Sequence, residues 1–150
     1  MHNPNDVRNT YNQIAHSFDK TRNAMWPCMK SFYLRYKPDF ILDVGCGNGK
    51  NILPNKCLWY ELCDITDAFI SMCTNRFPSA GVSQVDAERL PYRSDVFDTC
   101  ISIAVIHHLN TPSKRLHAIR EMIRVTRPDG VVFLTVWKRN DSFANDRYVK

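Results

Sequence analysis

The sequence predicts an α/β fold built on a doubly wound, mostly parallel sheet. Five short apolar runs, each bounded by turn residues, have the length and composition of strands that are buried on both faces. Longer amphipathic stretches, typical of helices, lie between several of these runs. Alternation of strand and helix implies right-handed crossovers and therefore parallel strands. With 150 residues, the chain has the size of one domain.

The predicted elements follow one another along the chain. The expected strands are Phe40–Val44, Trp59–Cys63, Gly81–Val85, Phe97–Ile103 and Val131–Trp137. The expected helices between strands are Thr66–Arg76, with Thr66 as its N-cap, and Ser113–Val125, which ends before the turn Arg127-Pro128-Asp129-Gly130. Ahead of the first strand, Asn5–His16 and Trp26–Tyr36 are predicted to form two helices that cover the open side of the site.

Composition excludes several classes of protein. No apolar run approaches the roughly 18 residues of a membrane span, and Met1–Asn9 lacks the apolar core of a secretory signal. The six cysteines form no Cys-x-x-Cys pair, which favours a reducing compartment, the cytoplasm or the nucleus, and no metal site. The net charge of +5 is compatible with a nucleic-acid partner. A modest basic cluster comprises Lys114, Arg115, Arg120, Arg124 and Arg127.

Three glycines mark the end of the first predicted strand. Gly45, Gly47 and Gly49 permit a tight turn and the close approach of a ligand to the backbone. Their Gly-x-Gly-x-Gly spacing differs from the Gly-x-Gly-x-x-Gly fingerprint of dinucleotide sites. Lys50 stands where the third dinucleotide glycine would fall. The spacing therefore disfavours a pyrophosphate cofactor.

Acidic residues stand at the ends of successive predicted strands. Asp43 precedes the first glycine by two positions, and Asp64 could accept hydrogen bonds from both hydroxyls of a ribose. Asp86 could bond an adenine amino group, and Ala87 could offer its backbone NH. Each acid alone is more often a loop cap or a solvated side chain. Together with the glycines they indicate a nucleoside-containing cofactor, because ligands of open α/β sheets bind at the carboxyl ends of strands.

These motifs resemble those of a known family. The pattern Asp43-x-Gly45-x-Gly47-x-Gly49, with Asp64, Val85-Asp86-Ala87 and Phe97-Asp98, is similar to that of the class I S-adenosylmethionine-dependent methyltransferases. The likeness covers about residues 6 to 138 and narrows to the eukaryotic tRNA wobble-uridine methyltransferases, which include the methyltransferase domain of the AlkB-homologue protein. The segments that carry it are Tyr11–Pro27, Asp43–Lys50, Ile101–His108, Arg127-Pro128-x-Gly130 and Val136-Trp137.

The resemblance implies a function and a fold. The function is methyl esterification of carboxymethyluridine at the wobble position of the tRNA anticodon loop, with S-adenosylmethionine as cofactor and a small zinc-binding activator subunit as partner. The fold of the family is a Rossmann-like sheet, and because the sequence ends soon after the fifth predicted strand, we expect the last two strands usual in class I methyltransferases to be lacking. We expect a helical cap at residues 1–38, the cofactor-binding core at 39–138, and a truncated tail at 139–150.

The same resemblance directs the choice of substrate residues. A carboxylate, with a pKa of about 4, is already nucleophilic at neutral pH, so catalysis should consist of positioning. We expect Arg22 to orient that carboxylate and one of His107 and His108 to touch substrate, the other being structural. Tyr11 and Trp26 are candidates to close over cofactor and base, with core packing an equal role for Trp26. The turn through Cys46 and the backbone at Ile103-Ala104 should face the cofactor.

Two other functions fit parts of the sequence. A class I methyltransferase acting on a small molecule, such as a quinone precursor, would share the cofactor half and differ in the flanking signatures. A truncated, non-catalytic regulatory or tRNA-binding module would fit the short chain but not the intact cofactor acids. Methylation assays on tRNA and on small molecules distinguish the first alternative from a tRNA methyltransferase. Calorimetry with S-adenosylmethionine distinguishes the second alternative, which need not bind the cofactor.

Overall fold

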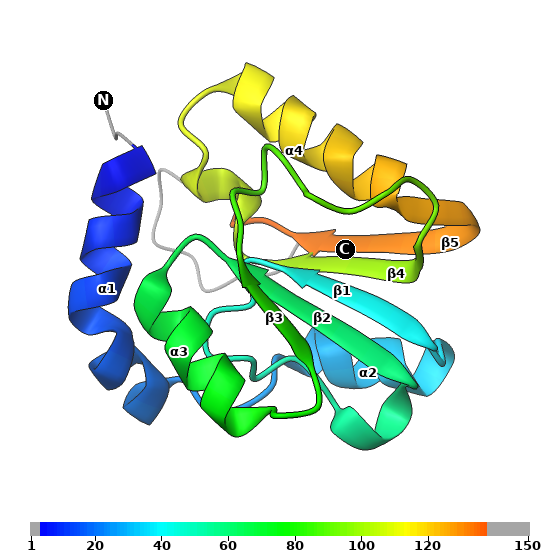
Figure 1. Cartoon of the computed structure of the whole chain (residues 1–150), viewed down its shortest axis with the longest axis horizontal. Coiled ribbons are helices and arrows are strands. Elements are labelled where there is room, and N and C mark those ends of the chain that lie inside the picture. Colours follow the sequence, from blue (N-terminus) through cyan, green and yellow to red (C-terminus); the bar gives the residue numbers. More distant parts are fainter. Residues whose placement is uncertain (1–3, 138–150) are drawn as a thin grey trace.

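The computed structural model describes residues 4–137, in which five strands form one parallel sheet (Figure 1). The strand order is β3-β2-β1-β4-β5, and every neighbouring pair is parallel. The strands are β1 (Phe40–Val44), β2 (Trp59–Asp64), β3 (Gly81–Gln84), β4 (Phe97–Ile103) and β5 (Thr126–Thr135). The predicted doubly wound α/β fold is confirmed, whereas the predicted tail at 139–150 lies outside the described residues.

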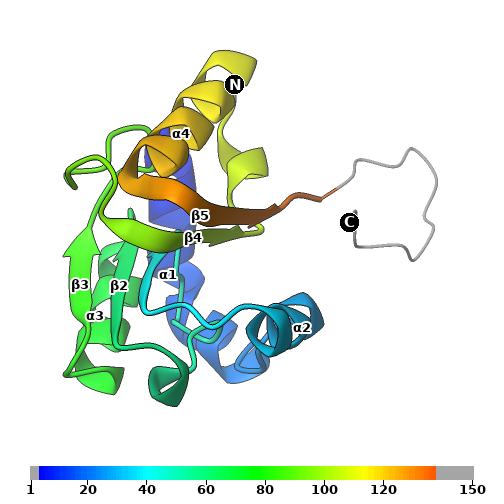
Figure 2. The same cartoon turned by 90° about the vertical axis from the view of Figure 1, so that its right-hand side faces the viewer.

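Helices surround the sheet on three sides. The α-helices are α1 (Pro4–Thr21), α2 (Pro27–Arg35), α3 (Asp67–Arg76) and α4 (Pro112–Val125), and the short 3-10 turns are η1 (Pro54–Lys56) and η2 (Ile106–His108). Helices α2 and α3 cover one face of the sheet and α4 covers the other (Figures 1 and 2). Helix α1 stands beyond the carboxyl ends of the strands, beside α3 (Figure 1).

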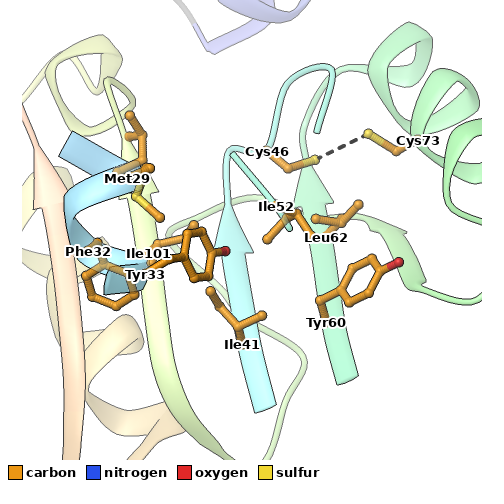
Figure 3. Close-up of a cluster of buried hydrophobic side chains, with 11 residues drawn as sticks. Met29, Phe32, Tyr33, Ile41, Cys46, Ile52, Tyr60, Leu62, Cys73 and Ile101 are labelled. Carbon is orange, nitrogen blue, oxygen red and sulfur yellow. Dashed lines mark hydrogen bonds between the residues drawn. The ribbon is translucent and has the colours of Figure 1, made fainter. Parts of the chain in front are cut away.

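Each face of the sheet has its own apolar core. Ile41, Leu62 and Ile101 pack with Met29 and Phe32 of α2 on one face (Figure 3). On the other face, strand residues pack against α4; this cluster includes Leu42, Cys63, Cys100, Ala118 and Met122. Neighbouring residues of a strand point to opposite faces, so a sheet covered on both sides needs apolar residues at nearly every strand position.

Helix α1 is longer than the predicted segment Asn5–His16. It continues to Thr21, and in these last turns the hydroxyls of Ser17 and Thr21 donate to the carbonyls of Ile14 and Ser17, respectively. The apolar stripe of the helix also continues through Phe18, whose ring packs edge-on to Tyr11. The additional turn brings the end of α1 to the glycine turn after β1.

Strand β5 begins earlier than the predicted Val131. Thr126 pairs with Phe97, and Val131 pairs with Thr99, so the four residues 127–130 stand opposite the single residue Asp98. The predicted turn at these residues is therefore a bulge inside the strand, with Asp129 in the left-handed region at φ 65°.

Two observations bear on the class of protein. Among residues 4–137, no helix combines the length and apolarity that crossing a bilayer requires. All six cysteines fall in this part of the chain, and each is a free thiol.

Candidate functional site

A cavity of about 380 Å³ lies between α1 and the carboxyl ends of the strands. Its volume falls within the range of about 300–1,000 Å³ that is usual for small-molecule sites. Most of the predicted site residues line it: Tyr11, Arg22, Trp26, Gly45, Cys46, Gly47, Asp64, Asp86, Ala87, Ile103, His107 and His108. Asp43 and Gly49 do not line the cavity.

The glycine turn presents its backbone to this cavity at Gly47. This residue has φ 53°, and a Cβ placed on it would meet nothing within 4 Å, so the space in front of the backbone is open. Gly49 differs, because a Cβ there would lie 2.4 Å from the ring of Phe77. Its predicted role as a cofactor contact does not match this position. Gly49 instead allows the turn to pack closely against the end of α3.

Two thiols support the turn from beneath. Cys73 of α3 donates from Sγ to the Gly47 carbonyl oxygen at 3.2 Å, and its sulfur lies 4.0 Å from that of Cys46 (Figure 3). The contact with Cys73 and burial raise the pKa of the Cys46 thiol well above its usual value. The thiol of Cys46 is thus an inert packing group, and this residue adjoins the cavity as part of the turn.

Asp64 ties the turn to the start of α3. Its Oδ2 accepts from the Gly47 backbone NH and its Oδ1 accepts from the Thr66 backbone NH, both at 2.9 Å. Thr66 occupies the N-cap position as predicted, but its side chain makes no capping hydrogen bond. Burial raises the pKa of Asp64, and the two backbone donors counteract that effect. Each carboxylate oxygen retains capacity for a second donor from a ligand.

Asp43 is completely buried behind the turn. Neither of its carboxyl oxygens has a hydrogen-bond partner in the described part of the chain. Burial, with a smaller contribution from Asp64, raises the pKa of Asp43 to about 8. An orphaned acid of this kind is costly to fold, and such groups are characteristic of functional sites.

Asp86 and Ala87 line the cavity in the loop that follows β3. Asp86 is exposed and accepts from the Glu88 backbone NH at 2.9 Å, which fixes the loop. Lys114, at the start of α4, forms an ion pair with Glu88 at 2.8 Å and also borders the cavity.

The two histidines belong to η2, directly after β4. Tyr11 of α1 bonds His108 Nε2 through its hydroxyl at 3.2 Å. His107 lies against Trp137, with ring centroids 5.4 Å apart and an interplanar angle of 26°. Burial, and then the neighbouring His108, lower the pKa of His107 to about 4, and burial also lowers that of His108. Both imidazoles are therefore neutral at pH 7.

Ala104, between β4 and η2, has φ 59° although it carries a Cβ. Its backbone NH donates to the Thr135 hydroxyl at 3.0 Å, which holds this strained conformation at the cavity wall.

One wall of the cavity is the apolar stripe of α1, which sequence reasoning noticed only at Tyr11. Val7, Tyr11, Ile14 and Phe18 line the cavity from successive turns of this helix. Their spacing of four, three and four residues is the period of one helical face, so the signal was present in the sequence.

Lys50 is a second residue that sequence reasoning did not assign to the site. It lines the cavity together with Arg22 and Trp26. Its Nζ lies 5.3 Å from the Trp26 ring centroid and 5.5 Å from that of Phe18. No sequence period identifies it, because it follows the glycine turn on a loop.

Helix α1 is fastened to α3 at both ends. Arg8 forms a bidentate ion pair with Asp67 at 2.8 Å, and Asn12 accepts from the Ala68 backbone NH at 3.0 Å. At the other end, Arg76 pairs with Asp19 at 2.9 Å and donates to the Asn48 carbonyl at 2.8 Å. These contacts hold α1 over the cavity and connect it to the glycine turn.

Comparison with known proteins identifies the family. A model of the methyltransferase domain matches residues 42–134. The chain belongs to this methyltransferase family. Membership confirms the predicted enzyme class, a methyltransferase.

Curated relatives are similar over most of this chain. They include enzymes named tRNA (carboxymethyluridine(34)-5-O)-methyltransferase from Arabidopsis thaliana, 43% identical over 87% of this chain, and from Saccharomyces cerevisiae, 35% identical over 87%. The mouse enzyme of that name, ALKBH8, is 38% identical over 94%. The chain spans 32%, 47% and 21% of the length of these relatives, respectively.

Solved structures share the fold at lower identity. The [4+2]-cyclase SpnF has a TM-score of 0.76 at 20% identity, covering 91% of this chain and 62% of its own. A complex of the Haloferax volcanii Trm112 methyltransferase activator with a methyltransferase gives 0.75 at 18% identity, covering 87% and 60%. These likenesses confirm the Rossmann-like class I methyltransferase fold.

The residues present fit the predicted cofactor, S-adenosylmethionine. The open backbone at Gly47 and the carboxylate of Asp64 line the cavity, and the orphaned carboxyl of Asp43 is buried behind the glycine turn. A ligand that carries ribose hydroxyls and a positive charge can satisfy groups of this kind.

Proposed function

We propose that this methyltransferase esterifies the carboxylate of carboxymethyluridine at the wobble position of tRNA. The observation that carries the proposal is Arg22, which lines the cofactor cavity and has no ion pair within the described residues. The curated relatives, 35–43% identical, are named for this reaction. An arginine beside a methyl-donor site suits an acceptor that is itself an anion.

Within this proposal the cofactor end of the cavity has defined roles. Asp64 binds the ribose hydroxyls, Asp86 and the Ala87 NH bind adenine, and the backbone at Gly45, Gly47 and Ile103 faces the methionine part. S-adenosylmethionine supplies a methyl group that its sulfonium activates for transfer.

The chain's residues then need only to position the acceptor. A carboxylate with a pKa of about 4 is ionised at neutral pH and needs no general base. Arg22 holds it by a two-pronged hydrogen bond, while Trp26 stacks on the base. The neutral imidazole of His107 or His108 hydrogen-bonds the uracil or the carboxylate without adding charge.

The proposed partners are the tRNA anticodon loop and a small zinc-binding activator subunit, in the cytoplasm or nucleus. The activator is supported by the structural likeness to a methyltransferase that is in complex with the Trm112 activator. No helix able to span a membrane occurs among residues 4–137, and no membrane partner is proposed.

The decisive experiment incubates the chain with S-adenosylmethionine and tRNA that carries carboxymethyluridine, with and without an activator subunit. Mass spectrometry of the nucleosides should detect methoxycarbonylmethyluridine, and tRNA with an unmodified wobble uridine should give no product. Cofactor binding without any tRNA ester, even with the activator, would refute the proposal. A product from a panel of small carboxylic acids alone would establish the small-molecule alternative.

A further inference from the structure

A basic group that the cofactor roles do not use lies at the cavity wall. The ammonium of Lys50 stands between the rings of Phe18 and Trp26, at 5.5 and 5.3 Å from their centroids. It is half-buried and lines the same cavity as the cofactor-binding turn. Because Lys50 directly follows Gly49, the rigid turn that faces the cofactor also sets its position.

The ring of Phe18 carries a second cation. The guanidinium carbon of Arg22 lies 5.1 Å from the same ring centroid. Two positive side chains from distant parts of the sequence are therefore gathered around one aromatic ring. Cation–π attraction to the ring offsets part of their mutual repulsion.

No described acidic residue neutralises this pair of cations. Asp19, in the last turns of α1, is already bound by Arg76 and by the side-chain amide of Asn48, at 2.9 and 2.8 Å. Burial, and then the charge of Arg22, lower the pKa of Lys50. A partly buried ammonium beside an exposed guanidinium, without a described counter-charge, forms a site that favours an anion.

We propose that Lys50 is a second substrate-binding residue that holds, together with Arg22, the carboxylate of the acceptor nucleoside. The inference rests on the proposed function, because it assigns the anion as the carboxymethyl group. The four acceptor positions of a carboxylate can serve both cations and still leave an oxygen for reaction. Arg22 supplies planar, paired donors, and Lys50 supplies a compact charge.

Such a site distinguishes substrate from product. In the transfer, a carboxylate oxygen forms a bond to the methyl carbon, and the methyl–sulfur bond breaks with its electron pair going to sulfur. The acceptor changes from an anion to a neutral ester, the sulfonium becomes a neutral thioether, and no proton moves. The ester therefore loses its attraction to both cations. Lys50 acts on binding and selectivity rather than on the reactivity of the carboxylate.

The test compares two tRNAs that differ only at the wobble base, one with carboxymethyluridine and one with uridine. Wild type should bind the carboxymethylated tRNA more tightly. Lys50→Gln should lose about tenfold of that preference and raise KM with little change in kcat, whereas Lys50→Arg should keep most of it. Lys56→Gln, an exposed lysine on η1 outside the cavity, removes the same charge and should leave the preference unchanged. Calorimetry should show that Lys50→Gln still binds S-adenosylmethionine, which also demonstrates folding.

Three outcomes would overturn the assignment. If Lys50→Gln weakens the binding of both tRNAs equally, Lys50 contacts a backbone phosphate. Loss of cofactor affinity alone would show that it holds the carboxylate of S-adenosylmethionine. An unchanged preference in Lys50→Gln would show that Lys50 binds neither anion. Wild type without any preference would refute the proposed function itself, which distinguishes that failure from a failure of the Lys50 assignment.

Discussion

At the scale of residues, Asp64 and Arg22 have separable tasks. Asp64 links the Gly47 and Thr66 backbones beside the cofactor end, whereas Arg22 shares the ring of Phe18 with Lys50. Asp64→Ala should therefore weaken S-adenosylmethionine binding about 10- to 100-fold, the equivalent of hydrogen bonds to a charged group worth about 1.5–3 kcal/mol. Arg22→Ala should spare cofactor binding and reduce methyl transfer to tRNA by a similar factor.

Calorimetry measures the first effect, and single-turnover transfer to carboxymethylated tRNA measures the second. The two variants act as controls for each other, because each should lose one function and retain the other. If Arg22→Ala abolishes cofactor binding instead, Arg22 holds the cofactor's own carboxylate, and its assignment to the acceptor is wrong.

The low pKa of His107 in η2 predicts how kcat/KM and the stability of the fold depend on pH. Burial lowers the pKa of His107 to about 4, so its charge changes below the ordinary histidine range, and the acceptor carboxylate is ionised above about pH 4. The value of kcat/KM should then be flat from about pH 6 to 7, below the range in which Asp43, with its pKa of about 8, changes charge. Since the folded state favours the neutral ring, His107 stabilises the fold above pH 6.5, and this stability is lost as pH falls toward 4.

Rate measurements across that pH range, at constant ionic strength, test the expectation. Trp137→Ala removes the ring that lies on His107 and should raise the histidine's pKa toward 6.5, which NMR titration can follow. A histidine inflection near pH 6.5 in the wild-type rate would show that an imidazolium takes part in the reaction.

At the scale of elements, α1 depends on its attachment to α3. Arg76 bridges Asp19 of α1 and the Asn48 carbonyl of the glycine turn, in a partly exposed position. Arg76→Ala should cost about 1 kcal/mol of global stability, as expected for such ion pairs, but loosen one wall of the cavity. We expect weaker binding of S-adenosylmethionine and faster amide exchange in the last turns of α1.

Arg120→Ala supplies the matched control, because Arg120 is exposed on α4 and has no ion pair within residues 4–137. Hydrogen exchange of the two variants, with and without cofactor, measures the local effect. Equal exchange of α1 in both variants would show that its apolar stripe alone holds the helix in place.

The elements also show where sequence reasoning succeeds and where it stops. The positions of the strands followed from apolar runs, because a sheet covered on both faces imposes that composition, and their parallel direction followed from the alternation of strand and helix. The end of α1 was placed too early, at His16, although the apolar period of one helical face continues to Phe18 and the helix ends at Thr21. The bulge opposite Asp98 was read as a turn, because its pairing depends on register across the sheet.

At the scale of the whole molecule, many residues that line the cavity could be predicted from the sequence, whereas the pairing of its charged side chains could not. Residues at strand ends converge by topology, which is why Asp64 and Asp86 were found together with the glycines. Gly49 was misplaced because the motif does not show which glycine faces the ligand and which packs against Phe77. Lys50 was not predicted as a site residue, because the sequence does not show which carboxylates are already paired with other cations.

The net charge of +5 overstates how many cations of the basic cluster on and beside α4 are left to bind tRNA phosphates. Three of its five members are paired: Lys114 with Glu88, Arg124 with Glu121, and Arg127 with Asp98. Arg124 also donates to the carbonyls of Leu90 and Tyr92, so Arg124→Gln should lower stability without changing how tRNA binding responds to salt. Arg120→Gln, which removes an exposed charge, should make that response shallower if this face contacts tRNA.

For wild type, if the two remaining members of the cluster, Arg115 and Arg120, each neutralise one phosphate of a single-stranded loop, the slope of log affinity against log salt concentration is about −1.4. Binding of S-adenosylmethionine should change little over the same range, because its site is a cavity and its acids lie close to the ligand. Titrations of tRNA and cofactor at several salt concentrations measure both slopes. If the two slopes are equal, the exposed cations do not contact phosphates, and tRNA recognition then resides in the cavity that holds Arg22 and Lys50.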